Sequence, residues 1–328
     1  MHVQMTEERT ARIVDAACAA PSIHNSQPWQ FEAAGDELRL RGVADRALAV
    51  ADPDARALYI SCGAALFNAR IAARMAGLTS DVIVLPHPEY PFDVLAVLTF
   101  TRGQGPSPGE AKLYEAIWQR HTNRGPYSPA RIPRVLVAGL QKSAVAEDAT
   151  LRMLNRPDTA AVLELAADAG QELAASRAHQ DELRRWIKDG ADYGIPSWAL
   201  PARPARAPGP VRDADLLAAA PRRGARADYE RHPQLAVLTT EHDEPADWLR
   251  AGEALQHVLL VATLNGLSAS FLYQVIERDD MLGGERTWPW PEHPQMVIRL
   301  GYGHRVVPTP RRSSGDATRA TGRLQATH

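Results

Sequence analysis

Residues 63–78 of this 328-residue chain read GAALFNARIAARMAGL, and residues 252–267 read GEALQHVLLVATLNGL. When the two segments are aligned, six of the sixteen positions are identical, among them Gly63 with Gly252 and Gly77 with Gly266. Each segment has the spacing of a helix that ends at a glycine, and a strand-like segment follows each helix. Two unrelated amphipathic helices that share a glycine stop remain an alternative. The constant offset favours two related halves in one chain.

The composition places the chain among ordinary globular proteins. Apolar residues make up 45% and charged residues 23%, and the net charge of −2 gives no field that favours nucleic acid or an anionic membrane. There is neither a charged-then-apolar leader nor an apolar run as long as a membrane span, so a cytoplasmic protein is expected. Cys18 and Cys62 have no metal-ligand spacing and are expected to be buried free thiols.

The pattern along the chain alternates helices and strands in both halves. Residues 1–105 are expected to form the first half, residues 106–312 the second half, and residues 313–328 a flexible tail. Residues 190–230 are rich in Pro, Gly and Arg, which predicts an extended, lid-like surface insertion within the second half. Helices are expected at 6–20, 53–76, 110–119, 133–144, 157–188 and 246–265, and strands at 29–31, 38–40, 82–85, 94–100, 151–154, 235–239 and 296–300.

Three short motifs could carry a binding site. They are PSIHNSQPW at 21–29, RHTNR at 120–124, and the ending RLGYG at 299–303 with PTPRR at 308–312. Taken singly, the first is consistent with a polar helix-to-strand turn, the second with a solvated helix end and the third with a basic tail. An isolated histidine such as His24 is more often structural than functional.

In this order, and together with the repeated helix, the motifs resemble those of the FMN-dependent nitroreductase superfamily. The most similar branch is the Acg-like one, whose members are duplicated single chains. The resemblance implies an α+β fold, duplicated in one chain as a pseudo-dimer, with central antiparallel or mixed sheets surrounded by helices. It covers most of residues 6–312, without the 190–230 segment.

The resemblance also implies where FMN binds, because each family site takes one turn from each half. Thr122 departs from the family's serine. The phosphate would contact the basic residues, amides would bond the polar edge of the ring, and a backbone N–H of Tyr273 or Gln274 would face flavin N5. The implied cofactor-binding residues are Ser22, Ile23, His24, Asn25, Gln27, Arg120, Thr122, Asn123, Arg124, Tyr273, Gln274, Arg311 and Arg312. Neither a catalytic side chain nor a metal is expected, because the flavin carries the chemistry.

Each half lacks one of the two turns. The start MHVQMTEERTAR has no R-x-[ST]-x-R motif, and the second half has VAEDATLRML at 145–154 where its own PSxxN would follow a helix. The chain is therefore expected to assemble one FMN site, as a monomer that is an internal pseudo-dimer.

The leading functional hypothesis is an oxidoreductase that passes hydride from NAD(P)H to flavin N5 and then reduces a small nitroaromatic or quinone. The alternative is a flavin-storing or redox-sensing protein whose insertion closes over FMN and prevents turnover. A dedicated biosynthetic dehydrogenase is a third option. The arginines between 203 and 226 suit a solubilising loop or, alternatively, capture of a nucleotide phosphate.

Overall fold

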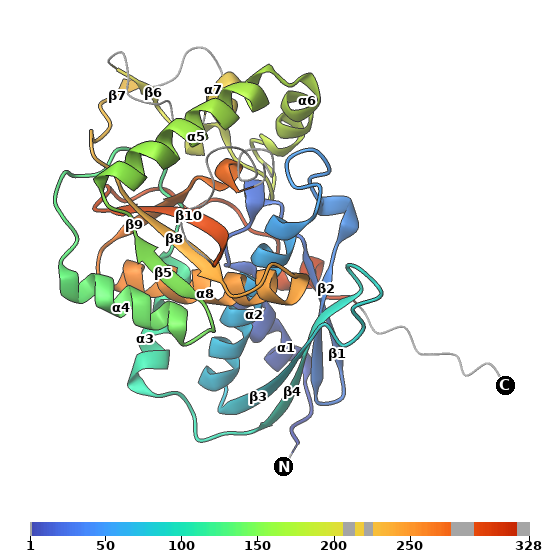
Figure 1. Ribbon diagram of the computed structural model, residues 1–328. Helices are drawn as coiled ribbons and strands as arrows, with labels where there is room; N and C mark the ends of the chain where they lie inside the picture. The colour runs from blue at the N-terminus through green and yellow to red at the C-terminus, as the bar shows by residue number, and fades with distance from the viewer. Residues whose placement is uncertain (1, 206–213, 220–225, 277–291, 320–328) are drawn as a thin grey trace.

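The first half of the chain forms a four-stranded antiparallel sheet with two helices (Figure 1). The computed structural model describes residues 2–205, 214–219, 226–276 and 292–319. The sheet order is β1-β2-β4-β3, and helix α2 connects the second and third strands in the chain. The elements are α1 (Glu7–Cys18), β1 (Trp29–Ala34), β2 (Glu37–Gly42), α2 (Arg56–Met75), β3 (Leu78–Val84) and β4 (Val94–Arg102).

The second half repeats this topology in a second sheet of order β5-β8-β10-β9, also antiparallel throughout. Helix α8 connects β8 to β9, as α2 connects β2 to β3. The expected α+β architecture is therefore confirmed. The elements are α3 (Pro108–Gln119), α4 (Arg134–Val145), β5 (Thr150–Met153), α5 (Arg156–Ala175), α6 (Arg177–Trp186), β6 (Arg203–Pro204), α7 (Ala214–Ala219), β7 (Arg226–Ala227), β8 (Gln234–Thr240), α8 (Pro245–Leu264), β9 (Ser268–Phe271) and β10 (His293–Gly301).

The two halves meet along α2 and α8, which lie between the two sheets (Figure 1). Both helices are 20 residues long, and the alignment that pairs Gly63 with Gly252 also pairs their first and their last residues. The helices cross at these two glycines: a Cβ on Gly63 would lie 3.0 Å from the Cα of Gly252, and would overlap the carbonyl oxygen of Leu249. The repeated glycine is therefore explained by the close approach of two backbones.

The same crossing carries a buried hydrogen-bond chain. The side-chain amide of Gln256 donates to the Asn68 oxygen at 2.8 Å, and the Asn68 amide nitrogen donates to the Ala16 carbonyl at 2.8 Å. Asn68 and Gln256 are both completely buried, so these bonds satisfy groups that would otherwise be costly to bury.

Two stretches differ from the sequence prediction. The helix expected over 157–188 is interrupted at Ser176, which ends α5 and whose hydroxyl accepts from the His179 N–H to cap α6. The tail expected to be flexible from residue 313 instead forms α10 (Ser314–Ala317), which packs on α1 and β1. Arg319 then donates its N–H to the carbonyl of Phe31 at 2.7 Å. Residues 320–328 lie outside the described part of the chain.

Both cysteines are free and buried, at Cys18 in α1 and Cys62 in α2. Burial raises the pKa of the Cys18 thiol to about 11. At neutral pH this thiol is therefore protonated and a poor nucleophile. Among the described residues, no group of His, Cys, Asp and Glu side chains could hold a metal ion, and no helix is long and apolar enough to cross a membrane.

Candidate functional site

The turn that follows α1 has an unusual backbone. Three of its four residues from 24 to 27 have positive φ angles, which few residues other than glycine adopt. They are 46° at His24, 55° at Asn25 and 52° at Gln27. Two hydroxyls stabilise this conformation: Ser22 Oγ accepts from the Gln27 N–H at 2.9 Å, and Ser61 Oγ from the Ile23 N–H at 3.2 Å. Strained backbone of this kind is concentrated at functional sites, so it identifies the turn as a candidate.

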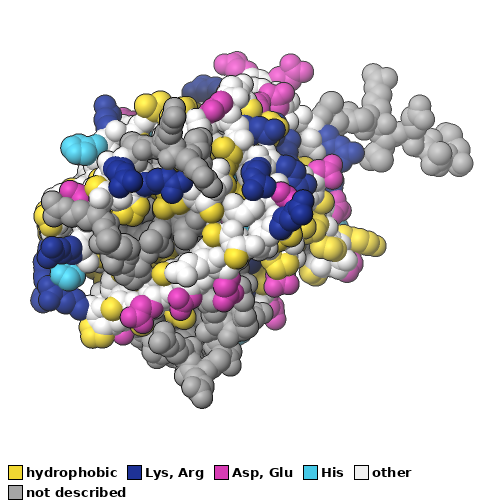
Figure 2. All heavy atoms as spheres, turned by 90° about the horizontal axis from the view of Figure 1, so that it is seen from above, with side chains coloured by type: hydrophobic (Ala, Val, Ile, Leu, Met, Phe, Trp, Pro, Cys, Tyr) yellow, Lys and Arg dark blue, Asp and Glu magenta, His cyan; other side chains and the backbone are white. Residues whose placement is uncertain are grey.

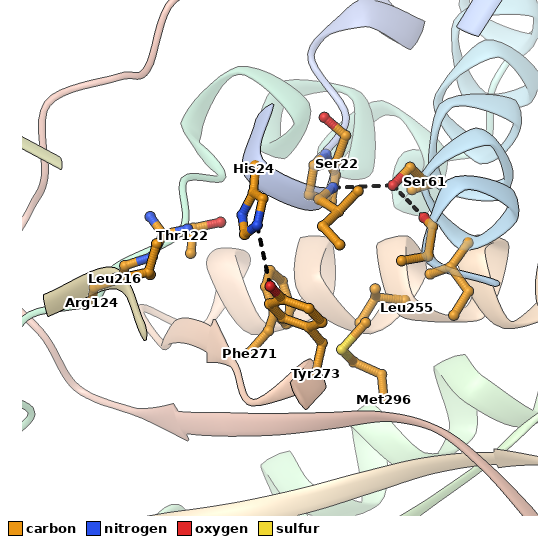
Figure 3. A pocket seen from close by; sticks show the side chains of 15 residues that line it. Ser22, His24, Ser61, Thr122, Arg124, Leu216, Leu255, Phe271, Tyr273 and Met296 are labelled. Carbon is orange, nitrogen blue, oxygen red and sulfur yellow. Dashed lines mark hydrogen bonds between the residues drawn. The ribbon is translucent and has the colours of Figure 1, made fainter. Parts of the chain in front are cut away.

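The turn borders a cavity that lies between the two halves (Figure 3). Its empty volume is about 680 Å3, open solvent at the mouth included. The lining comes from the turn, from α2 and α8, from the RHTNR turn and from β9 with the residues after it. The lining residues are Pro21, Ser22, Ile23, His24, Ala57, Ile60, Ser61, Ala64, Thr122, Arg124, Leu216, Leu255, Phe271, Tyr273 and Met296.

Two side chains from different halves meet across the cavity. The Nε2 atom of His24 lies 3.2 Å from the hydroxyl of Tyr273, and the two rings are arranged edge to face (Figure 3). Burial lowers the pKa of His24 to about 3, with Arg124 adding to the effect and Asp215 opposing it. The imidazole is therefore neutral at physiological pH.

The RHTNR turn is held against β9 of its own half. Asn123 donates its N–H to the Ala269 carbonyl at 2.9 Å, and its side-chain amide donates to the His304 carbonyl at 2.8 Å. This anchoring places Thr122 and Arg124 in the cavity wall. Arg120 points away from that wall into a smaller, neighbouring cavity, which shares Thr122 and Phe271 with the first. The two spaces are therefore adjacent.

Two arginines near these cavities have no described carboxylate partner. Arg120 lines the smaller cavity, and the half-buried Arg311 lines a third cavity that shares His121 with it. Arg120 is 3% exposed, and its Nη2 atom donates to the Ala19 carbonyl at 3.2 Å. Arg311 bonds through Nη1 to oxygens of Thr309 and Pro310, while the Nε atoms of both arginines lack a partner. No described Asp or Glu forms a salt bridge with either one. Burial and the charge of Arg311 lower the pKa of Arg120 to about 9, and burial lowers that of Arg311 to about 10.

Such a pair is costly to the protein alone, because two like charges are desolvated together without compensation. His121 adds a third unsatisfied group: its Nδ1 atom has no partner, and burial together with the charges of Arg120 and Arg311 lowers its pKa to about 4. A bound anion would pair the two guanidinium groups and supply the missing acceptors.

Asn25 and Gln27 are predicted site residues that do not line the cavity. The Asn25 amide donates to the carbonyls of Gly194 (2.9 Å) and Pro310 (3.0 Å). The Gln27 amide donates to the Asp192 carbonyl at 2.8 Å, and its oxygen accepts from the Arg312 N–H at 2.9 Å. Both amides thus connect the turn to the insertion and to the C-terminal basic pair. Their contact with a ligand stays a prediction.

Arg312 differs from Arg311 in its surroundings. Its guanidinium lies 3.6 Å from Asp192 and 4.5 Å above the ring of Tyr193. It therefore has an acidic and an aromatic neighbour in the insertion. Gln274 is 2% exposed and its side-chain nitrogen has no partner, which leaves a donor for a ligand in this region.

Part of the insertion is packed, although the sequence suggested an extended surface segment. Leu216 and Leu217 of α7 are buried, and Leu216 forms part of the cavity wall. Asp215 lies 3.4 Å from Nε2 of His179 in α6, with both side chains almost fully buried. The signal in the sequence was the apolar pair at 216 and 217, followed by alanines. Ser61 was also missed, because a single serine in an alanine-rich helix carries no distinctive pattern.

The arginines of the insertion are only partly described. Seen from above, the face that carries α5 to α7 also carries groups of basic side chains (Figure 2). Arg203 donates to the Leu217 carbonyl at 3.0 Å, so it supports α7 from the side. Arg206, Arg212, Arg222 and Arg223 lie outside the described residues.

This arrangement of two antiparallel sheets with a cavity between related halves is that of a nitroreductase-like fold. A crystal structure described as "a putative nitroreductase" from Anabaena variabilis aligns with a TM-score of 0.52 at 9% identity, covering 90% of this chain and 88% of that one. The chain matches no protein-family model.

The relatives found by sequence identify the family more specifically than the solved structure does. The chain is 32% identical over 307 residues to "Putative NAD(P)H nitroreductase acg" of Mycobacterium tuberculosis, which covers 88% of this chain and 87% of that protein. An uncharacterized protein of the same organism is 30% identical over 308 residues, or 90% of this chain and 88% of that protein. The chain therefore belongs to the nitroreductase family, in its Acg-like branch, and the expected family is confirmed.

Proposed function

We propose that the chain is an FMN-dependent oxidoreductase that takes hydride from NAD(P)H and reduces a small aromatic acceptor of the nitro or quinone class. The observation that supports this most is the pair of uncompensated guanidinium groups of the buried Arg120 and the half-buried Arg311, since Arg120 lines a small cavity adjacent to the one that both halves border. The relative from Mycobacterium tuberculosis that is named as an NAD(P)H nitroreductase adds support.

The groups present fit FMN. A phosphate would accept from the two Nε atoms that have no protein partner, and arginine forks suit phosphate geometry. The unpartnered amide nitrogen of Gln274 is a donor for the polar edge of a flavin ring. When bound, FMN supplies a ring nitrogen, N5, that accepts hydride and passes two electrons on.

The chain's own residues have binding and shielding roles in this proposal. Arg120 and Arg311 would hold the phosphate, while Thr122, Arg124, Ser22 and Ile23, which line the cavity, would contact the ring. The apolar walls keep water from the reacting face. These walls consist of Ile60, Leu216, Leu255, Phe271 and Met296. We further propose that residues 1–105 and 106–312 are the two halves of one monomeric pseudo-dimer.

A second candidate function is flavin storage or redox sensing without turnover. The observation that favours it is the set of hydrogen bonds between the 21–29 turn and the insertion. Asn25 exchanges two hydrogen bonds with Gly194, since its amide donates to the Gly194 carbonyl and its own carbonyl accepts from the Gly194 N–H at 3.0 Å. Leu216 of the insertion also forms part of the cavity wall, where it would limit the entry of nicotinamide.

Anaerobic reduction separates the two candidates. The purified yellow protein should bleach within seconds of adding NADH or NADPH, because the reductase needs a cavity that nicotinamide can enter. Flavin absorbance in a stopped-flow instrument measures this, with dithionite as the control that reduces any bound flavin. Bleaching by dithionite alone would reject the reductase and favour storage. In that case Leu216→Ala, which shortens a wall side chain, tests whether the insertion is what blocks entry.

The single-site proposal predicts the cofactor ratio. Flavin released by denaturation should amount to one FMN per chain, because only one half carries each turn. Absorbance of the released flavin against amino-acid analysis of the chain measures the ratio. A ratio near two would contradict the proposal.

A further inference from the structure

Some of the polar side chains around the cavity already form hydrogen bonds with the protein backbone. Ser22 Oγ accepts from the Gln27 N–H, and Ser61 Oγ accepts from the Ile23 N–H while donating to the Ala57 carbonyl at 2.6 Å. These two hydroxyls are therefore occupied in holding the turn. Thr122 and Arg124 belong to the turn assigned above to the flavin.

The remaining polar groups in the wall are His24 and Tyr273, and they form a unit. Their hydrogen bond of 3.2 Å joins the two halves, and the ring centroids are 5.7 Å apart with the planes at 77°. His24 is 4% exposed and held in a left-handed conformation. Figure 3 shows the side chains of His24 and Tyr273 pointing toward each other in the cavity. The direction of the Tyr273 hydroxyl is thus fixed by a rigid neighbour.

The rest of the lining is apolar. A pocket with apolar walls and a few placed polar groups selects a flat, mainly apolar ligand that carries a polar group at one position. The polar position here is a neutral hydroxyl–imidazole pair, because burial keeps His24 uncharged. Of the groups that face it, Arg124 and His179 lower the pKa of His24 and Asp215 raises it.

We propose that His24 and Tyr273 determine acceptor specificity: the Tyr273 hydroxyl accepts from Nε2–H of His24 and donates its own proton to a carbonyl or nitro oxygen of an aromatic acceptor in the cavity. This rests on the proposed function and assigns the residues that recognise the oxygen of its acceptors. Tyr273 is the contacting residue and His24 a positioning residue. The pair makes and breaks no covalent bond.

The test uses menadione, a quinone, and the variant Tyr273→Phe, which keeps the ring and removes the hydroxyl. Binding is measured by calorimetry on the oxidised FMN-loaded protein and on the apoprotein, where no turnover occurs. We expect affinity about fivefold to tenfold weaker, the usual effect of one neutral hydrogen bond. Tyr90→Phe, the same change at an exposed tyrosine, should leave binding unchanged.

A second measurement uses protein reduced with dithionite, so it does not depend on NAD(P)H. Tyr273→Phe should slow reoxidation by menadione several-fold but not reoxidation by ferricyanide, which offers no carbonyl or nitro oxygen. His24→Asn should also slow reoxidation by menadione, and asparagine tolerates the left-handed backbone at this position. The double variant should be little slower than either single variant, because the two residues act together.

Two results would overturn the proposal: unchanged menadione affinity in Tyr273→Phe, or equal slowing with both oxidants. A chain that retains no FMN would reject the proposed function instead. The apoprotein binding measurement would then still decide whether the pair recognises the quinone.

Discussion

Replacing Arg120 by alanine is expected to weaken FMN binding by about a hundredfold or more while raising the thermal stability of the apoprotein. Hydrogen bonds to charged groups contribute about 1.5–3 kcal/mol each, and an arginine fork makes two, so the loss should exceed about 3 kcal/mol. The opposite effect on the apoprotein follows from burial, because the charged guanidinium is desolvated beside Arg311 and no described carboxylate compensates it.

Fluorescence quenching of free FMN measures the first effect, and a thermal melt of flavin-free protein measures the second. Arg120→Lys keeps one charge but loses the fork and should lie between wild type and alanine. Arg131→Ala removes an exposed arginine and should change neither quantity. Full flavin retention in Arg120→Ala, or an apoprotein that melts lower than wild type, would reject the phosphate role.

The duplication also bears on the proposal that the chain holds a single flavin. The alignment of the two helices pairs Ala64, which lines the cavity, with Glu253 of α8. Glu253 lies 2.6 Å from Arg70, and Arg70 also bonds Glu147 at 2.8 Å. Glu147 stands in the segment that replaces the second PSxxN turn. The place equivalent to the cavity wall is therefore occupied by an ion-pair cluster, which supports one flavin per chain.

The sequence predicted best the features that depend on local patterns. The helix-end glycines, the alternating strands and the repeat were readable because each is set by residues close in the chain. The two polar turns were identified through the family resemblance, although the structure leaves their ligand contacts as predictions. Their positions on either side of the cavity agree with a site built from both halves.

The features that the sequence did not predict depend on long-range contacts. His24 and Tyr273 are hydrogen-bonded over a separation of 249 residues, and Gln27 bonds Asp192 over 165. The periodicity of apolar residues along the sequence cannot predict hydrogen bonds between residues so far apart. Composition was also misleading for α7, because prolines and arginines on either side of a short apolar pair suggested a solvated segment. Likewise α10 depends on burying Ala317 and on backbone bonds to β1, which a polar tail does not indicate.

The largest effect on stability is expected from alanine at the helix crossing. A Cβ on Gly63 would overlap the Leu249 carbonyl oxygen, and one on Gly252 would lie 2.8 Å from the Cα of Gly63 and overlap the Ile60 carbonyl oxygen. Since backbone atoms cannot move aside as a side chain can, α2 and α8 must separate. We expect Gly63→Ala and Gly252→Ala each to cost more than about 3 kcal/mol, at the upper end of single substitutions.

The control is Gly139→Ala in the middle of α4, where an added Cβ meets nothing within 4 Å. There alanine should stabilise the helix by about 0.5–1 kcal/mol. The same glycine-to-alanine change should therefore raise the free energy of unfolding at position 139 and lower it at positions 63 and 252. Urea unfolding followed by circular dichroism measures both. Equal effects at positions 63 and 139 would contradict the close crossing.

The crossing should also decide whether the two halves unfold together. Leu249 and Leu260 of α8 are buried in the core of the first half, and Ile60 of α2 in the core of the second. Each helix therefore stabilises both cores, and wild type is expected to unfold in one transition. Because Gly252→Ala separates the helices without removing either core, its unfolding should broaden or split into two transitions, which calorimetry would resolve.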